Sequence, residues 1–159
     1  MSALEVKGTS AAIVGDHIEV VIRVHNQSDR THYAYSNVRT FHWDSASRTL
    51  KIYLADSALS AKMRDHPHLK LPHMQTLAPN EDAEIKVSLP VEFSRMSGDS
   101  LRIEQVSMQD VQTVEVELAF SDTPFYHKVG GKPLGHQLIQ WAGKSRIKQK
   151  IPIAHPANR

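Results

Sequence analysis

Apolar and polar side chains alternate at every second position in several separated segments of this 159-residue chain. The clearest segments are residues 18–24, 50–54, 83–89 and 114–120. Because successive side chains of a β-strand point to opposite faces, this period predicts strands with one buried and one solvated face. Strands of this kind are typical of antiparallel sheets, so the pattern predicts a mainly β fold.

Weaker signals predict further strands. A short strand is expected near residues 4–7 and a longer one near residues 35–43, and a last strand is indicated by Ile147, Ile151 and Ile153. Residues 44–47, Asp-Ser-Ala-Ser, are turn formers between two strands and predict a hairpin. About seven strands at this spacing predict a sandwich of two antiparallel sheets.

Three stretches break the alternation. Residues 57–76 form a long polar segment, expected to be a loop, and residues 101–108 change parity, which predicts a bulged or irregular strand. Residues 134–142 place apolar side chains at near-helical spacing and predict one short C-terminal helix. We expect a single domain over residues 1–159, with a sandwich core of about 4–120 and the helix and a basic strand or tail in 121–159.

Two turn signals resemble those of a known fold family. Asn26 and Ser28 follow the second predicted strand, and Leu77 and Pro79 lead into the strand of residues 83–89. With the strand count, these features resemble immunoglobulin-like or fibronectin-III-like sandwiches over roughly residues 4–120. The resemblance implies a fold and no particular activity, because such sandwiches host many functions.

Composition excludes several kinds of site. The chain has no cysteine, which rules out disulfides, thiolate–zinc centres and cysteine nucleophiles. It has no N-terminal signal pattern and no apolar run of the roughly 18 residues that a membrane span needs. These features predict a soluble, cytoplasmic protein.

Charge is divided unevenly along the chain. From Thr123 onward there is no acidic residue but seven basic ones, which leaves 12 basic and 17 acidic side chains, a net charge of −5, in the first 122 residues. Such asymmetry indicates a basic end that meets a polyanion or folds onto its own acidic body.

Four of the basic residues share parity: Lys144, Arg146, Lys148 and Lys150. An extended strand would present them in one row, for which three interpretations compete: lysines that protect an edge strand, a docking surface for an acidic protein, and a site for nucleic acid or anionic lipid. Nucleic acid is the weaker candidate because few aromatic side chains for base stacking lie nearby. The predicted partner-binding residues are this row with Trp141, Phe125 and Tyr126.

Histidines gather in the long polar segment. His66 and His68 would lie on one side of an extended segment, and His73 follows five residues later. This trio is a hypothetical divalent-metal site, with Asp65 as an oxygen ligand and His25, His32 or His42 as neighbours; solvated loop histidines are the competing interpretation. No other cofactor is predicted.

No catalytic motif is present in the sequence, including the G-x-S-x-G nucleophile pattern. Glu115 and Glu117 share a strand face and are interpreted as a charged outer face. The favoured function is therefore a non-enzymatic protein-binding or adaptor module of the β-sandwich type, with another, acidic protein as partner. The alternative is a metal- or small-molecule-dependent site on the His66–His73 loop.

Overall fold

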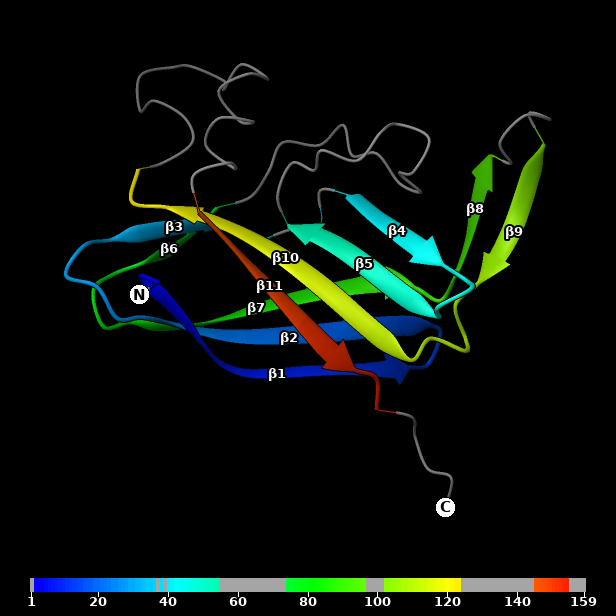
Figure 1. Ribbon diagram of the computed structural model, residues 1–159, viewed down its shortest axis with the longest axis horizontal. Coiled ribbons are helices and arrows are strands. Elements are labelled where there is room, and N and C mark those ends of the chain that lie inside the picture. Colours follow the sequence, from blue (N-terminus) through cyan, green and yellow to red (C-terminus); the bar gives the residue numbers. More distant parts are fainter. Residues whose placement is uncertain are drawn as a thin grey trace.

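The computed structural model describes residues 2–36, 38, 40–54, 74–96, 102–123 and 145–154. All regular elements in these residues are strands, so the predicted mainly β fold is confirmed (Figure 1). In chain order the strands are β1 (Leu4–Val14), β2 (His17–Asn26), β3 (His32–Tyr35), β4 (Thr40–Asp44), β5 (Thr49–Leu54), β6 (Met74–Leu77), β7 (Asp82–Pro90), β8 (Glu92–Met96), β9 (Ile103–Ser107), β10 (Thr113–Ser121) and β11 (Ser145–Pro152).

One sheet contains β1, β2 and β7 in that order, and both pairings are antiparallel. Its central strand β2 buries every second side chain from Ile18 to Val24, and their neighbours on β7 do the same from Ile85 to Leu89. The register of β1 against β2 shifts between Val6 and Gly8, which marks a β-bulge. The alternation in the sequence therefore corresponds here to one buried and one solvated sheet face.

The larger sheet has six strands and is mixed, so the expectation of purely antiparallel sheets is wrong for this sheet. Its order is β4-β5-β10-β3-β6, and β11 pairs with β10 on the side away from β5 and β3. β10 is parallel to β5 but antiparallel to β3 and β11. In Figure 1 β10 and β11 run obliquely across β2 and β7. The strand β10 is thus the centre of the sheet, and β11 lies at its edge.

The buried apolar side chains of the two larger sheets form one continuous core. Val20 and Ile22 of β2 are at most 2% exposed, and Val116 and Leu118 of β10 are each 1% exposed. Burial of each such side chain is worth about 1.5–3 kcal/mol, which makes this core the main source of stability.

A separate two-stranded hairpin is made by β8 and β9 and lies at the right of Figure 1. Phe93 on β8 packs edge-on against Phe41 of β4, with ring centroids 5.2 Å apart. Arg95 Nε donates to Glu104 Oε1 across the hairpin at 2.8 Å. The bulged or irregular strand predicted in residues 101–108 is wrong for β9, which pairs with β8 in unbroken register.

Several sequence predictions need correction. The single strand expected at residues 35–43 is two strands, β3 and β4, which lie on opposite sides of β5 in the sheet order. The strand expected at residues 4–7 extends to Val14, and residues 74–76 of the expected long loop belong to β6. The hairpin predicted at residues 44–47 is confirmed between β4 and β5. The helix predicted at residues 134–142 lies outside the described residues.

Candidate functional site at the β11 edge

The strand β11 carries the predicted basic row. Arg146, Lys148 and Lys150 are exposed, whereas Ser145, Ile147 and Gln149 between them are half-buried. Within the described residues β11 pairs with one strand only, β10, along its whole length. Just past its end, Ala154 N donates to Ala11 O of β1 at 2.8 Å, where the edges of the two sheets meet. The basic side chains therefore lie along an edge strand.

The register places this row beside acidic side chains. Lys148 is directly opposite Glu117, and Lys150 is directly opposite Glu115. Arg146 reaches diagonally along the sheet, and its Nη1 donates to Glu117 Oε1 at 2.8 Å. The Glu117 residue is only 9% exposed, so this is a largely buried carboxylate with a charge-assisted partner. Part of the basic end therefore folds onto the acidic body of the chain.

The outer face around these strands keeps a positive excess. Lys51 on β5 is opposite Glu115 from the other side, and Tyr53 is opposite Glu117. Together with Lys148 these side chains line a small cavity of about 120 Å³. Burial and the nearby Glu117 and Glu115 carboxylates raise the pKa of the Tyr53 hydroxyl above its ordinary value. Among β5, β10 and β11, two acidic groups on this face, Glu115 and Glu117, thus lie beside four cations, Lys51, Arg146, Lys148 and Lys150.

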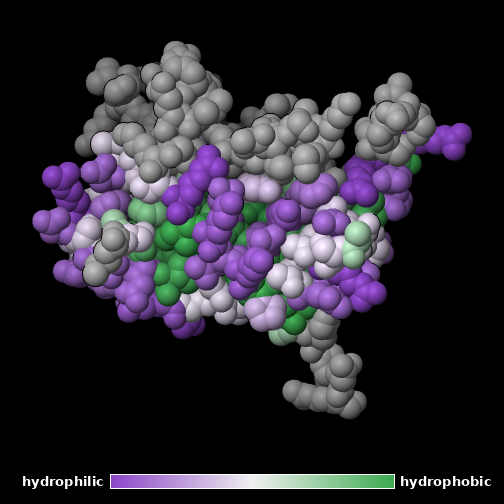
Figure 2. Space-filling view, in the orientation of Figure 1, coloured by the Kyte–Doolittle hydropathy of each residue, from purple (hydrophilic) through white to green (hydrophobic). Residues whose placement is uncertain are grey.

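Figure 2 shows this face as a surface. A hydrophilic band crosses its middle at the position of β11, and hydrophobic surface lies beside it. A charged edge next to apolar surface is chemically suited to an extended partner chain, which offers main-chain groups to the edge and side chains to its surroundings.

A larger cavity of about 490 Å³ adjoins the start of β11. It lies between the N-terminal end of β1 and the ends of β10 and β11. The described residues that line it are Ser2, Ala3, His32, Phe120, Ser121, Asp122, Ser145 and Arg146. Its volume is within the range of small-molecule sites.

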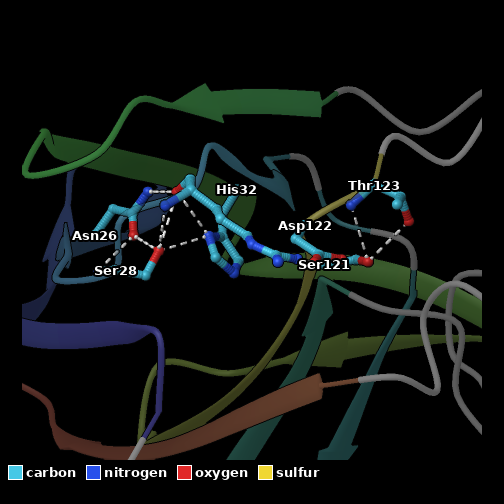
Figure 3. A network of polar contacts seen from close by, with 7 residues as sticks. Asn26, Ser28, His32, Ser121, Asp122 and Thr123 are labelled. Carbon is cyan, nitrogen blue, oxygen red and sulfur yellow. Dashed lines mark hydrogen bonds and ion pairs between the residues drawn. The ribbon is translucent and has the colours of Figure 1, made fainter.

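A polar network fixes the orientation of His32 at this cavity (Figure 3). The side chain of Asn26 is fully buried and donates to the carbonyl oxygens of Arg30, Leu77 and Ala78 at 2.7–3.2 Å. Its Oδ1 accepts from Ser28 Oγ at 2.7 Å. The Asn26 amide therefore holds the β2–β3 turn against the chain that joins β6 to β7, and His32 begins the strand that follows.

Opposite His32, the end of β10 supplies further polar groups. Ser121 Oγ accepts from the backbone N–H of Thr123 at 3.2 Å, and Arg30 Nη1 donates to Asp122 Oδ2 at 3.3 Å. Figure 3 shows Ser121, Asp122 and Thr123 on the far side of His32 from Asn26. The sequence does not indicate that these residues form a site; Asn26 and Ser28 mark a turn in it, but only the fold shows that this turn positions His32.

The predicted metal site is not tested. His66, His68, His73 and Asp65 lie outside the described residues, and no three potential metal ligands converge in the part of the chain that is described. His25 is instead paired with Asp82, with Nδ1 and Oδ1 2.6 Å apart. A divalent metal on the histidine segment therefore stays a prediction.

Only some of the predicted partner-binding residues lie in the described part of the chain. Arg146, Lys148 and Lys150 share one strand as expected. Lys144, Trp141, Phe125 and Tyr126 lie outside the described residues, so their place relative to β11 stays a prediction. No helix in the described ranges is long and apolar enough to cross a membrane.

Comparison with known proteins shows no family. No protein-family model and no curated protein matches the sequence. Among solved structures, the chain is similar to a β-glucosidase from Listeria innocua, seen as a mutant in complex with laminaribiose and in complexes with isofagomine and with glucose. The identities are 12%, 12% and 11%, and the TM-scores are 0.36, 0.36 and 0.35. The matches cover 94–95% of this chain and 16% of the enzyme chain, and a likeness this low carries no argument.

Proposed function

We propose that this chain is a non-enzymatic protein-binding module of the immunoglobulin-like sandwich type, which adds an extended, acidic segment of its partner to the edge of β11. The observation that carries the proposal is that β11 pairs on one side only within the described residues and carries two exposed lysines, Lys148 and Lys150, on that same strand. Strand addition at an exposed sheet edge is a common mode of peptide recognition.

The strand order supports the immunoglobulin-like part of the proposal. The order β1-β2-β7 corresponds to strands A, B and E of that fold, and β6-β3-β10-β11 corresponds to C′, C, F and G. The hairpin of β4 and β5 departs from the pattern, because it occupies the side of β10 that a longer strand C would cover. The correspondence therefore depends on the paired strands and not on this insertion.

Electrostatics supports an acidic partner. Arg146 is already engaged by Glu117, but Lys148 and Lys150 have no acidic group within ion-pair distance in the described part of the chain. Ammonium groups of this kind steer a negatively charged partner and raise its rate of association. Main-chain pairing would supply affinity, and the lysines would select the acidic strand.

A protein fits this surface better than a nucleic acid. Glu115 and Glu117 lie directly beside the lysines and would repel a continuous phosphate backbone. An extended peptide differs, because its acidic side chains occur at every second position and can face the lysines alone. Nucleic acid is therefore an outcome of the test and not the proposal.

The test uses a synthetic peptide as long as β11, capped at both ends, in which glutamate alternates with threonine. Fluorescence anisotropy would measure its binding to the full chain at about 50 mM and about 300 mM salt. We expect the Lys148→Ala/Lys150→Ala double variant to bind about tenfold more weakly at low salt, and the difference to shrink at high salt.

The matched control removes two exposed lysines from the other sheet. Lys7→Ala/Lys86→Ala causes the same change in net charge, and each of these lysines lies next to an acidic residue, Glu5 or Glu84. We expect its affinity to stay within about twofold of the unchanged chain. An equal loss in both double variants, or tighter binding of a single-stranded oligonucleotide than of the peptide, would overturn the proposal.

A further inference from the structure

The hydrogen bonds of His32 determine which ring nitrogen faces the 490 Å³ cavity as an acceptor. Nδ1 lies 3.1 Å from the carbonyl oxygen of Arg30, which can only accept. Nδ1 also lies 3.1 Å from Ser28 Oγ, whose single proton has two closer acceptors, Asn26 Oδ1 at 2.7 Å and the Arg30 carbonyl oxygen at 3.0 Å. The neutral ring therefore carries its proton on Nδ1, and Nε2 has a lone pair.

This lone pair is placed at the cavity wall. His32 is 8% exposed and lines the cavity, and in Figure 3 its second ring nitrogen points away from Asn26 and Ser28. The same wall contains Phe120, whose ring centroid lies 6.1 Å from that of His32 at an interplanar angle of 56°. The wall thus combines two rings with a hydrogen-bond acceptor.

The remaining groups restrict what the cavity can hold. Asp122 and Arg146 line the cavity with opposite charges, and Arg30 Nη1 lies 3.3 Å from Asp122 Oδ2, so neither sign of charge dominates and the lining suits a neutral polar side chain. A purely apolar ring would displace water from His32 Nε2 and Asp122 without replacing its hydrogen bonds. An aromatic ring with a hydroxyl donor satisfies both the rings and the acceptors.

The position of the cavity links it to β11. Ser145 and Arg146 begin this strand, and both line the cavity. A partner strand that runs along the edge of β11 that faces away from β10 and continues past Ser145 would bring its next side chains between β11 and the start of β1.

We infer that this cavity is the specificity pocket for a tyrosine of the docked strand, with the phenol hydroxyl donating to His32 Nε2. The inference rests on the proposed function, since it assigns the occupant to the same partner segment. Pockets that accept particular side chains commonly give strand addition its specificity, and a buried tyrosine usually finds a partner for its hydroxyl.

The first experiment uses free probes and does not depend on strand docking. The ¹⁵N-labelled full chain is titrated with N-acetyl-tyrosinamide, and in parallel with its O-methyl ether and with N-acetyl-phenylalaninamide. We expect saturable shifts of the His32, Ser121 and Ser145 amides, with the tyrosine probe binding at least about fivefold tighter than the two probes that lack the hydroxyl donor. Equal affinity of the three probes, or shifts at another surface, would overturn the inference.

A second experiment places tyrosine in the acidic peptide, at the end that would pass Ser145, and compares it with phenylalanine at that place. We expect about fivefold tighter binding for the tyrosine peptide, and we expect His32→Phe to abolish this preference while the phenylalanine peptide still binds. His32→Leu, which also lacks the acceptor nitrogen, is a second variant if His32→Phe does not fold, and it should abolish the preference as well. If the acidic peptide binds with no preference for tyrosine, the pocket is wrong and the edge proposal stands.

Discussion

The outer faces of the two larger sheets differ in whether their basic side chains have acidic partners. On the three-stranded sheet the cations have acidic partners nearby: Lys86 lies 3.4 Å and Arg23 lies 3.8 Å from Glu84, and Lys7 lies 3.2 Å from Glu5. On the six-stranded sheet Arg146 takes Glu117 at 2.8 Å, while Lys148 and Lys150 have no such partner among the described residues. On the first face these cations are paired with acidic residues of the same sheet, whereas, among the residues that the structure describes, the second face retains unpaired lysines on its edge strand β11.

The difference also concerns burial. The Glu117 side chain is 11% exposed and that of Arg146 is 29% exposed, whereas those of Glu84 and Arg23 are 42% and 69% exposed. Ion pairs in water are nearly neutral for stability, but a charge left alone in a buried place is costly. The same pair of residue types therefore has a structural role on β11 and little effect on β2.

The largest expected effect comes from removing the cation of the partly buried Arg146–Glu117 pair. Arg146→Ala leaves the Glu117 carboxylate without its partner and should lower the free energy of unfolding by about 2–4 kcal/mol, measured by urea denaturation. Arg23→Ala is the control and should change it by less than about 0.5 kcal/mol. Similar losses in the two variants would show that the faces do not differ in this way.

A smaller effect on the free energy of unfolding is expected at alkaline pH, and it arises in the six-stranded sheet. The pKa of Tyr53 is raised by burial and by Glu117 and Glu115, so its protonated form is favoured in the folded chain. The resulting stability is fully present below the unfolded pKa of about 10 and is lost as pH rises through the higher folded pKa.

Urea midpoints at about pH 9 and about pH 11 would detect this change, and the fall should be smaller in Tyr53→Phe than in the unchanged chain. The strands β1, β2 and β7 contain no tyrosine, so their face is the same in both proteins and cancels in the comparison. An identical pH dependence in both proteins would remove Tyr53 from the charged face.

Local sequence was sufficient for some of this arrangement. The period-two pattern in residues 114–120 and 147–153 predicted the faces of β10 and β11, because parity within one strand depends only on its own residues. The row of Arg146, Lys148 and Lys150 follows directly from that parity.

Other features depend on contacts between distant segments. The sequence does not indicate that β11 pairs with β10, that β5 runs parallel to β10, or that Arg146 reaches Glu117, because register across strands is set by the whole fold. The cavity at His32 was missed for the same reason: it is made by ends of β3, β10 and β11 and by Ser2 and Ala3. Nothing in the sequence around these residues indicates that they lie close together in the fold.

The proposal that β11 is the docking edge is tested most directly by amide hydrogen exchange, residue by residue, with and without the alternating acidic peptide. Addition of a strand should slow exchange at those β11 amides that do not bond to β10, since the peptide would accept their hydrogen bonds. Protection confined to another edge strand, such as β6 or β1, or no added protection on β11 at saturating peptide, would contradict the account.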